Sequence, residues 1–378
     1  MDKKQSIILV LLSFSLYISL GLPDSLIGSG WPVIRQDFHF SLELISVITT
    51  VQLLFSLLSN ALYIKVSTKV SEGSVIFLSM FSILISLFLM LFASNGIIFL
   101  ISIPFLGLGQ GAIDVAVNTI VARRFSEKIM NFVHAFYGLG VTLSSIFEAI
   151  SIRYTSTFRL AILLVLILHS IILIFFMTKR ATFTEHGEVD KKKKKSKLKF
   201  TLANWLFPVF YFLYAIEQIF SIYMASFLVF QHFDAAFSAL ITGIFWFSLM
   251  CGRIISGFLL DYLESEKFIL ILLFISFIGT LLMWFSPLFS AILIGGGFSG
   301  LYPTIMTLAH RYFNIEKANR IVALNVTAAG LGMFVMPLLF SALIASFNLL
   351  IFPWLFEIFF ILLAITGIFM LRLNVKEV

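Results

Sequence analysis

The sequence predicts an all-α membrane protein with twelve transmembrane helices. Of its 378 residues, 60% are hydrophobic and only 12% are charged, and the mean hydropathy is +1.06. A soluble globular domain carries about 25% charged residues and about 45–50% apolar ones. The apolar runs are continuous rather than alternating, and they are long enough to cross a bilayer as helices. These observations exclude a soluble domain and a β-barrel.

Twelve apolar stretches give the predicted spans. The first follows Lys3 and Lys4 and is similar to a signal peptide, but it is longer than the usual apolar core and no small-residue cleavage site precedes Pro23. We therefore expect it to be retained as helix 1. The spans are residues 7–31, 42–63, 74–93, 97–122, 131–152, 158–178, 202–230, 236–260, 268–285, 288–310, 320–346 and 349–371. They predict an N-terminal six-helix half (1–178), a basic linker (179–201) and a C-terminal six-helix half (202–378).

The distribution of charge predicts the topology. With the N-terminus inside, 23 of the 26 basic residues fall on the cytoplasmic side, and only Arg35, Arg153 and Arg159 do not. Basic segments resist translocation, so both termini and the linker are expected in the cytoplasm, with the protein in the cell membrane. Much of the net charge of +7 comes from the lysines in the linker. This charge does not indicate a nucleic-acid partner, and contact of the linker with anionic lipid is the less favoured interpretation.

An internal repeat supports two related halves. The stretch from Gly107 to Asp114 aligns without a gap on the stretch from Gly295 to Tyr302, and an Arg and a Phe follow both in register. The Gly-Leu-Gly of residues 138–140 recurs at residues 330–332. Small residues at such spacings allow helices to approach closely in lipid. Helices 4 and 10, and helices 5 and 11, are therefore expected to occupy equivalent places.

No enzyme signature is present in the sequence. It has no His-Glu-x-x-His, no Gly-x-Ser-x-Gly, no cysteine cluster and no Gly-rich loop followed by Lys-Ser/Thr. The single cysteine, Cys251, is expected to pack as a small apolar residue. We expect no enzymatic activity, no metal and no cofactor.

Carboxylates inside the predicted spans are the most informative residues. They are Asp24, Asp114, Glu148, Glu217 and Glu357. A charge at the bilayer centre costs about 2.5–3.5 kcal/mol, so each carboxylate requires a cavity, a partner or a proton. No Lys or Arg is expected deep in a span to pair with them, which favours a proton. Asp24 could instead cap a helix end, Glu217 could equally join helices by hydrogen bonds, and Glu148 and Glu357 are expected near the outer surface in structural roles.

Helical spacing predicts which faces are polar. Gln110, Asp114 and Asn118 recur at i, i+4 and i+8 on one side of helix 4. A second polar face covers an arc of about 120° on helix 7. Aromatic hydroxyls beside carboxylates and amides suit a polyhydroxylated ligand, which they can stack on and hydrogen-bond. The helix 7 face consists of Tyr211, Tyr214, Glu217, Gln218 and Ser221.

The chain resembles the major facilitator superfamily. The resemblance rests on its span pattern and on Gly252, Arg253, Gly257 and Asp261 after helix 8, whereas the corresponding residues 60–65 lack the acid. It implies two pseudo-symmetric six-helix halves and a cavity lined by helices 1, 4, 7 and 10, where Tyr302 joins the expected binding residues. It also implies that Arg253 and Asp261 form a conformational latch at the cytoplasmic end of helix 8.

A narrower resemblance is to the fucose permease branch of that superfamily. It rests on Gly21-Leu-Pro-Asp24 with Trp31-Pro32 in helix 1, on Asp114 with Asn118 in helix 4, and on residues 131–138 in helix 5. This resemblance implies that Asp24 and Asp114 serve proton coupling. Residues 144–145 depart from it, since they are Ser-Ser where relatives commonly have Gly-Pro.

The sequence and these resemblances together predict a secondary active transporter. We expect it to move a small, neutral, sugar-like solute by proton-coupled alternating access, as a monomer whose partners are substrate, protons and the lipid bilayer. An anionic solute is disfavoured because it would meet unpaired carboxylates in a low-dielectric cavity. Two alternatives stay open: a proton-driven exporter of hydrophobic or cationic compounds, and a transport-inactive receptor or lipid-translocating protein with the same fold.

Overall fold

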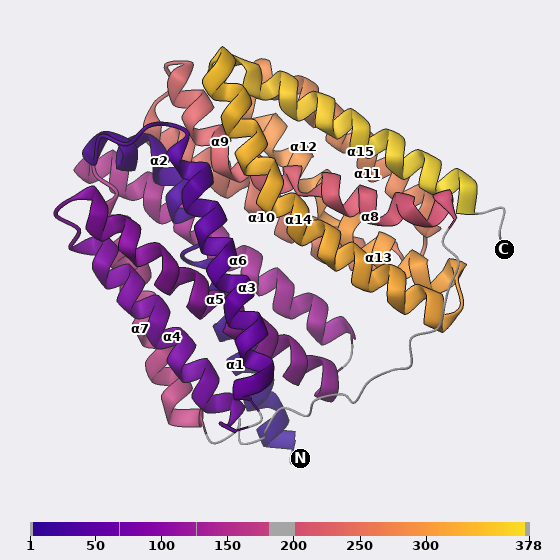
Figure 1. Cartoon of the computed structure of the whole chain (residues 1–378), viewed down its shortest axis with the longest axis horizontal. Helices are drawn as coiled ribbons and strands as arrows, with labels where there is room; N and C mark the ends of the chain where they lie inside the picture. The colour runs from indigo at the N-terminus through magenta and orange to yellow at the C-terminus, as the bar shows by residue number, and fades with distance from the viewer. Residues whose placement is uncertain (1–2, 68, 126, 181–200, 375–378) are drawn as a thin grey trace. The chain divides into compact units, whose positions relative to one another are not determined.

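The computed structural model is helical throughout the part of the chain that it describes, which is residues 3–67, 69–125, 127–180 and 201–374 (Figure 1). Twelve helices in these residues are long and apolar enough to cross a membrane. The predicted all-α class and the twelve spans are thus confirmed. Apart from residues 179, 180 and 201, the predicted linker lies outside the described residues.

The chain divides into two compact units. Unit 1 comprises Met1–Lys192 and Leu228–Gly243. Within it, α5 packs against α3 and α4, and α1 packs against α6. Its helices are α1 (Lys3–Gly21), α2 (Leu26–Asp37), α3 (Leu44–Val66), α4 (Glu72–Leu91), α5 (Gly96–Arg124), α6 (Glu127–Thr155) and α7 (Arg159–Lys179).

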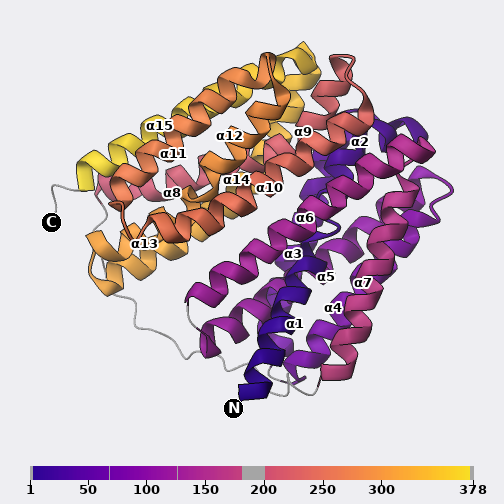
Figure 2. The same ribbon diagram turned by 180° about the vertical axis from the view of Figure 1, so that it is seen from behind.

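Unit 2 comprises Lys193–Phe227 and Ile244–Val378, and α10 crosses the division between the units. Here α8 packs against α14 and α15, and α11 packs against α12, as Figure 2 shows from behind. The α-helices are α8 (Leu202–Tyr214), α9 (Ile216–Phe230), α10 (Ala235–Leu259), α11 (Ser265–Leu281), α12 (Pro287–Ser299), α13 (Leu301–Tyr312), α14 (Ile315–Phe347) and α15 (Phe352–Asn374). Two short 3-10 helices, Leu282–Trp284 and Leu349–Ile351, extend α11 and precede α15.

Apolar side chains cover the outside of these helices, while small hydroxyl residues are buried between them. Phe88 and Phe274, for example, are 55% and 63% exposed. Ser13 is fully buried, and its hydroxyl donates to the carbonyl of Leu9 one turn earlier, at 2.8 Å. This distribution suits lipid as the solvent, because the apolar surface faces outward and buried hydroxyls such as that of Ser13 find partners within the protein.

Glycines hold the helices of unit 1 in close contact. A Cβ at Gly107 on α5 would meet the backbone carbonyl of Gln52 on α3. One at Gly109 would meet the backbone of Ser79 on α4. The helix backbones therefore touch at these positions, and no larger residue fits without a shift.

The aligned glycines of unit 2 make the equivalent contacts. A Cβ at Gly295 on α12 would meet the carbonyl of Phe245 on α10, and one at Gly297 would meet Ser276 on α11. The fourth span (α5) and the tenth span (α12 and α13) thus contact their neighbours in the same way, as the internal repeat predicts. A matching pair joins Gly140 to Ile18 on α1 and Gly332 to Phe212 on α8.

Candidate functional site

Three of the twelve spans are interrupted beside predicted site residues. The first span breaks between α1, which ends at Gly21, and α2, which begins at Leu26, and Asp24 lies in this gap. The seventh breaks between α8 and α9 just before Glu217, and the tenth breaks between α12 and α13 just before Tyr302. Discontinuous helices commonly form the binding sites of secondary transporters, because irregular backbone is tolerated where it is buried or lines a cavity.

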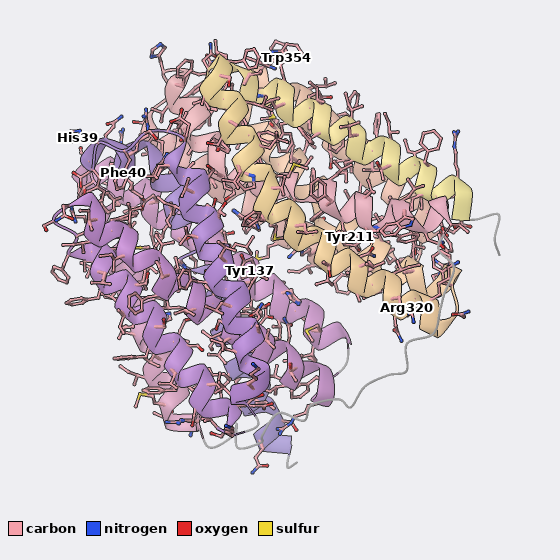
Figure 3. All side chains as sticks on the ribbon, viewed as in Figure 1. His39, Phe40, Tyr137, Tyr211, Arg320 and Trp354 are labelled. Carbon is pink, nitrogen blue, oxygen red and sulfur yellow. The ribbon has the colours of Figure 1, made fainter. Side chains whose placement is uncertain are left out.

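Asp24 lies in a cluster of neutral hydrogen-bond donors from three helices. The hydroxyl of Tyr137 on α6 donates to Asp24 Oδ2. The side-chain amides of Gln52 on α3 and Gln110 on α5 both donate to Oδ1 at 3.3 Å. Gln52 also donates to Gln110 Oε1 at 2.7 Å. Both carboxylate oxygens are thus occupied, and Asp24, Gln52 and Tyr137 are only partly buried. We refer to these four residues as the Asp24 cluster (Figure 3 labels Tyr137).

Asp114 is bound in a different way. The hydroxyl of Tyr17 on α1 and the amide of Asn118 on α5 both donate to the same oxygen, Oδ1, at 2.8 and 3.0 Å. Tyr17 is buried, whereas Asp114 and Asn118 are half-buried. The structure therefore joins Asp24 to Gln110 and Asp114 to Asn118, all of them predicted site residues.

Sequence reasoning missed three residues of these clusters: Tyr17, Gln52 and Tyr137. Each is uncharged, and none belongs to a polar stripe that runs along its helix. Tyr137 belongs to the helix 5 motif of residues 131–138. That motif was the one available signal.

In unit 2, Glu217 is paired with a basic residue. Arg253 Nη2 lies 3.8 Å from Glu217 Oε1, and the two side chains are 23% and 6% exposed. The expectation that no basic residue would pair with the buried carboxylates is therefore wrong for Glu217. The physical reason is that α10 continues to Leu259. Arg253 thus lies within the helix and can offset a buried charge that would otherwise be costly.

The predicted latch residue Asp261 lies apart from this pair. It is exposed in the turn after α10, where its backbone N–H donates to the carbonyl of Phe258 at 3.3 Å. Arg253 therefore makes its ion pair with Glu217 rather than with Asp261. The latch role that the resemblance gave to Asp261 stays a prediction.

Three predicted tyrosines gather at the break between α12 and α13. The hydroxyl of Tyr211 donates to the backbone carbonyl of Tyr302 at 2.6 Å, and their rings are 4.7 Å apart (Figure 3 labels Tyr211). The hydroxyl of Tyr214 donates to the carbonyl of Phe298 at 3.0 Å. Tyr211 and Tyr214 are buried, so their hydroxyls hold the interrupted backbone, while Tyr302 and Gln218 are half-buried.

Each of these clusters lies within one unit. Asp24 and Asp114 belong to unit 1, whereas Glu217 and Tyr302 belong to unit 2. Their convergence on one cavity stays a prediction. Within the described residues, no group of three or more His, Cys, Asp or Glu side chains could hold a metal ion.

Two bacterial transporters are similar to this chain in sequence along most of its length. The glucose/mannose transporter GlcP of Bacillus subtilis is 24% identical over 353 residues, which cover 85% of this chain and 84% of that protein. The probable nitrate transporter NarT of Staphylococcus epidermidis is 29% identical over 376 residues, which cover 93% and 92%. These two relatives carry solutes of different charge.

Solved structures share the fold at low sequence identity. The nucleoside transporter NupG matches with a TM-score of 0.75 at 14% identity, over 97% of this chain and 99% of that chain. The D-xylose-proton symporter matches with a TM-score of 0.74 at 12% identity, over 96% and 97%. Residues 10–337 match the Major Facilitator Superfamily. This chain therefore belongs to the Major Facilitator Superfamily and is a multi-pass membrane transporter, not an enzyme.

Proposed function

We propose that this protein is a proton-coupled transporter of a small, neutral, polyhydroxylated solute, of the fucose permease type. The Asp24 cluster is the observation that carries the proposal. It combines a partly accessible carboxylate with amide and phenol groups that can both donate and accept hydrogen bonds. Such a set suits sugar hydroxyls. A hydroxyl can take over a hydrogen bond from one of these neutral protein groups without leaving a charged group unpaired.

The proposed role of the acids follows from their partners. Asp24 and Asp114 are bonded only by neutral groups, so protonation of either one leaves no cation without its counter-charge. A proton can then be taken up with the solute on one side of the membrane and released on the other. The printed names of GlcP and of the D-xylose-proton symporter agree with a sugar and, for the latter, with a proton.

A second candidate, transport of a small anion, is favoured by Arg253 and by the name of NarT. Arg253 is already paired with Glu217, so an anion would have to displace a buried carboxylate. Moving Glu217 away from its cation without compensation is costly. The neutral solute is therefore the better-supported substrate class.

Reconstitution in proteoliposomes tests the proposal. The purified protein is first screened by thermal shift against hexoses, pentoses, 6-deoxyhexoses, nucleosides and nitrate, since a bound ligand stabilises by mass action. Solutes that stabilise it are then tested for counterflow and for solute-dependent proton movement with an internal pH dye. We expect a sugar to drive proton entry in the same direction as itself. Proton movement in the opposite direction supports an exporter, and nitrate accumulation without any sugar response contradicts the proposal.

The proposed topology places both termini and the linker in the cytoplasm of a cell-membrane protein. It rests on the distribution of 23 of the 26 basic residues. In a Cys251→Ser background, Lys193→Cys should resist an impermeant maleimide in intact cells and react after permeabilisation. Efficient labelling of intact cells would show that the topology is inverted.

A further inference from the structure

Glu148 on α6 is a buried acid that the proposed site does not use. It is 1% exposed, and neither carboxyl oxygen has a hydrogen-bond partner. Buried polar groups are nearly always hydrogen-bonded, and an unpaired buried carboxylate costs several kcal/mol, so the position of this acid requires a functional explanation. Glu148 thus differs from Asp24 and Asp114, whose oxygens accept hydrogen bonds from phenols and amides.

The space for this carboxyl group is made by a glycine on the neighbouring helix. A Cβ at Gly30 on α2 would overlap the Glu148 carboxyl group. The side chain therefore points into the interface between α2 and α6. In Figure 1, α2 lies at the end of unit 1 away from the N-terminus, which is the outer end in the proposed topology.

Two serine hydroxyls lie between Glu148 and the Asp24 cluster. Tyr137 and Glu148 are eleven residues apart on α6, which places them within about 20° on the same face and about 16 Å apart along the axis. Between them, the hydroxyls of Ser25 and Ser145 form a hydrogen bond to each other. Ser25 follows Asp24 directly, and Ser145 lies one turn before Glu148. At this spacing the Cβ atoms are about 5–6 Å apart.

Other charged groups around α6 do not compensate Glu148. Asp37 and Arg159 form an ion pair with each other at 2.9 Å, and His169 is bonded to Ser19 and to the carbonyl of Met80. Within the described residues, neither oxygen of Glu148 has a hydrogen-bond partner. Titratable groups on the elements packed against α6 include Tyr17 on α1, Asp24 in the gap, Arg35 and Asp37 on α2, Asp114 and Arg124 on α5, Arg159, His169 and Lys179 on α7, and Asp234 before α10; His134, Tyr137, Arg153 and Tyr154 lie on α6 itself.

We propose that Glu148 is a proton-binding site that exchanges a proton with Asp24 through the Ser25–Ser145 hydroxyl pair. Neither Glu148 nor Asp24 is hydrogen-bonded to this pair in the structure, so the exchange requires Glu148 to rotate toward Ser145 and the Ser25 hydroxyl to rotate toward Asp24. In the forward step, the Glu148 carboxyl group gives its proton to the Ser145 oxygen while Ser145 passes its own proton to Ser25. Ser25 in turn gives its proton to the Asp24 carboxylate. Each hydroxyl ends with one proton, and the negative charge has moved from Asp24 to Glu148. This inference rests on the proposed proton-coupled function.

Infrared difference spectroscopy tests the protonation site without relying on transport. Membranes containing wild type, Glu148→Gln and the control Glu72→Gln are compared during a step from neutral to alkaline pH. Glu72 suits the comparison because it lies in the same unit and is also 1% exposed. We expect wild type and Glu72→Gln to show the C=O band of a protonated carboxyl that disappears on the pH step, and Glu148→Gln to lack it. A wild type without this band, or a band that no alkaline step removes, overturns the proposal.

Transport assays then test the exchange with Asp24. We expect Glu148→Gln and Ser145→Ala to keep sugar counterflow but to lower proton-driven accumulation several-fold, with the infrared band still present in Ser145→Ala. Gly30→Ala, which crowds the carboxyl group, should reduce the band as well. Size-exclusion profiles and thermal midpoints show whether each variant is folded. Unchanged accumulation in folded Glu148→Gln shows a structural acid and refutes the relay. If the wild type moves no protons with any solute, the proposed function fails, while the infrared titration still decides whether Glu148 exchanges its proton.

Discussion

The acids of the two units are stabilised in opposite ways. In unit 1, Asp24 and Asp114 accept hydrogen bonds from neutral phenols and amides. In unit 2, Glu217 is paired with the guanidinium of Arg253. When a carboxylate bonded by neutral donors gains a proton, no partner is left as an uncompensated charge, whereas an ion pair fixes both charges, because removing one exposes the other. This difference supports the proposal that protons are exchanged in unit 1, while unit 2 holds a fixed ion pair.

The largest expected effect comes from breaking the ion pair. Arg253→Ala leaves Glu217 without its cation and should lower the free energy of unfolding by about 3 kcal/mol, near the low end for a buried pair because Arg253 is partly exposed. Chemical denaturation in detergent measures this loss. The double variant Glu217→Gln/Arg253→Gln should regain most of the stability. Simple additivity of the two single changes would mean that the pair is not coupled.

The next effect separates the two acids of unit 1. Asp24→Asn and Asp114→Asn should each lower proton-driven accumulation by roughly 100-fold, because an amide cannot carry the proton. Their effects on solute affinity should differ. Asp24 accepts hydrogen bonds on both oxygens, so the amide nitrogen of Asp24→Asn must face a donor. Both donors to Asp114 reach the same oxygen, so the amide nitrogen of Asp114→Asn can take the place of the other oxygen. Counterflow should therefore weaken strongly in Asp24→Asn and only slightly in Asp114→Asn. Full accumulation in both variants would remove these acids from the coupling.

A smaller effect is expected from a single donor in the Asp24 cluster. Tyr137→Phe removes the hydroxyl that bonds Asp24 Oδ2 and should weaken solute binding by about tenfold, near the lower end of the about 1.5–3 kcal/mol for a hydrogen bond to a charged group. Isothermal titration or thermal-shift titration with the identified solute measures this change. Tyr154→Phe is a matched control, since Tyr154 is 80% exposed at the end of the same helix. Equal affinities in the two variants would exclude Tyr137 from the binding site.

Glycine substitutions test whether the two units are built alike. Gly107→Ala and Gly295→Ala should each destabilise the protein by about 1–3 kcal/mol, because the new methyl group meets a backbone carbonyl in each unit. Gly257→Ala has open space around the new methyl group and should change stability by less than about 1 kcal/mol, with stabilisation the expected sign. Thermal midpoints of the three variants give the comparison. A large loss in Gly257→Ala alone would contradict the packing described for α10.

Hydropathy was enough to predict the spans but not their interruptions. A span is read from the average of many residues, and the breaks at Asp24, Glu217 and Tyr302 involve only a few residues each. The glycine repeat predicted which helices are equivalent, because close contact requires small residues at fixed spacings. Proline marks two of the breaks, since Pro23 lies at the first and Pro303 follows Tyr302 at the third, but no such residue marks the break before Glu217.

The polar faces of the candidate site were predicted where polar residues repeat along one helix. Gln110, Asp114 and Asn118 form such a stripe, and the structure bonds Gln110 to Asp24 and Asn118 to Asp114. Partners on other helices follow from tertiary packing, so the pair between Glu217 and Arg253 could not be read from spacing. The burial of Glu148 was missed for the same reason, since it depends on Gly30 of another helix.

The close glycine contacts also determine where unit 1 and unit 2 can deform. Where backbones touch at Gly107, Gly109, Gly295 and Gly297, neighbouring helices cannot slide past each other without a clash. Internal strain during a transport cycle must then concentrate where the helical hydrogen-bond ladder is already interrupted. Those points are the three gaps beside Asp24, Glu217 and Tyr302. We therefore expect the residues beside these gaps to be the first to change hydrogen-bond partners when a helix segment turns, which would couple the geometry of the site to the movement of the protein.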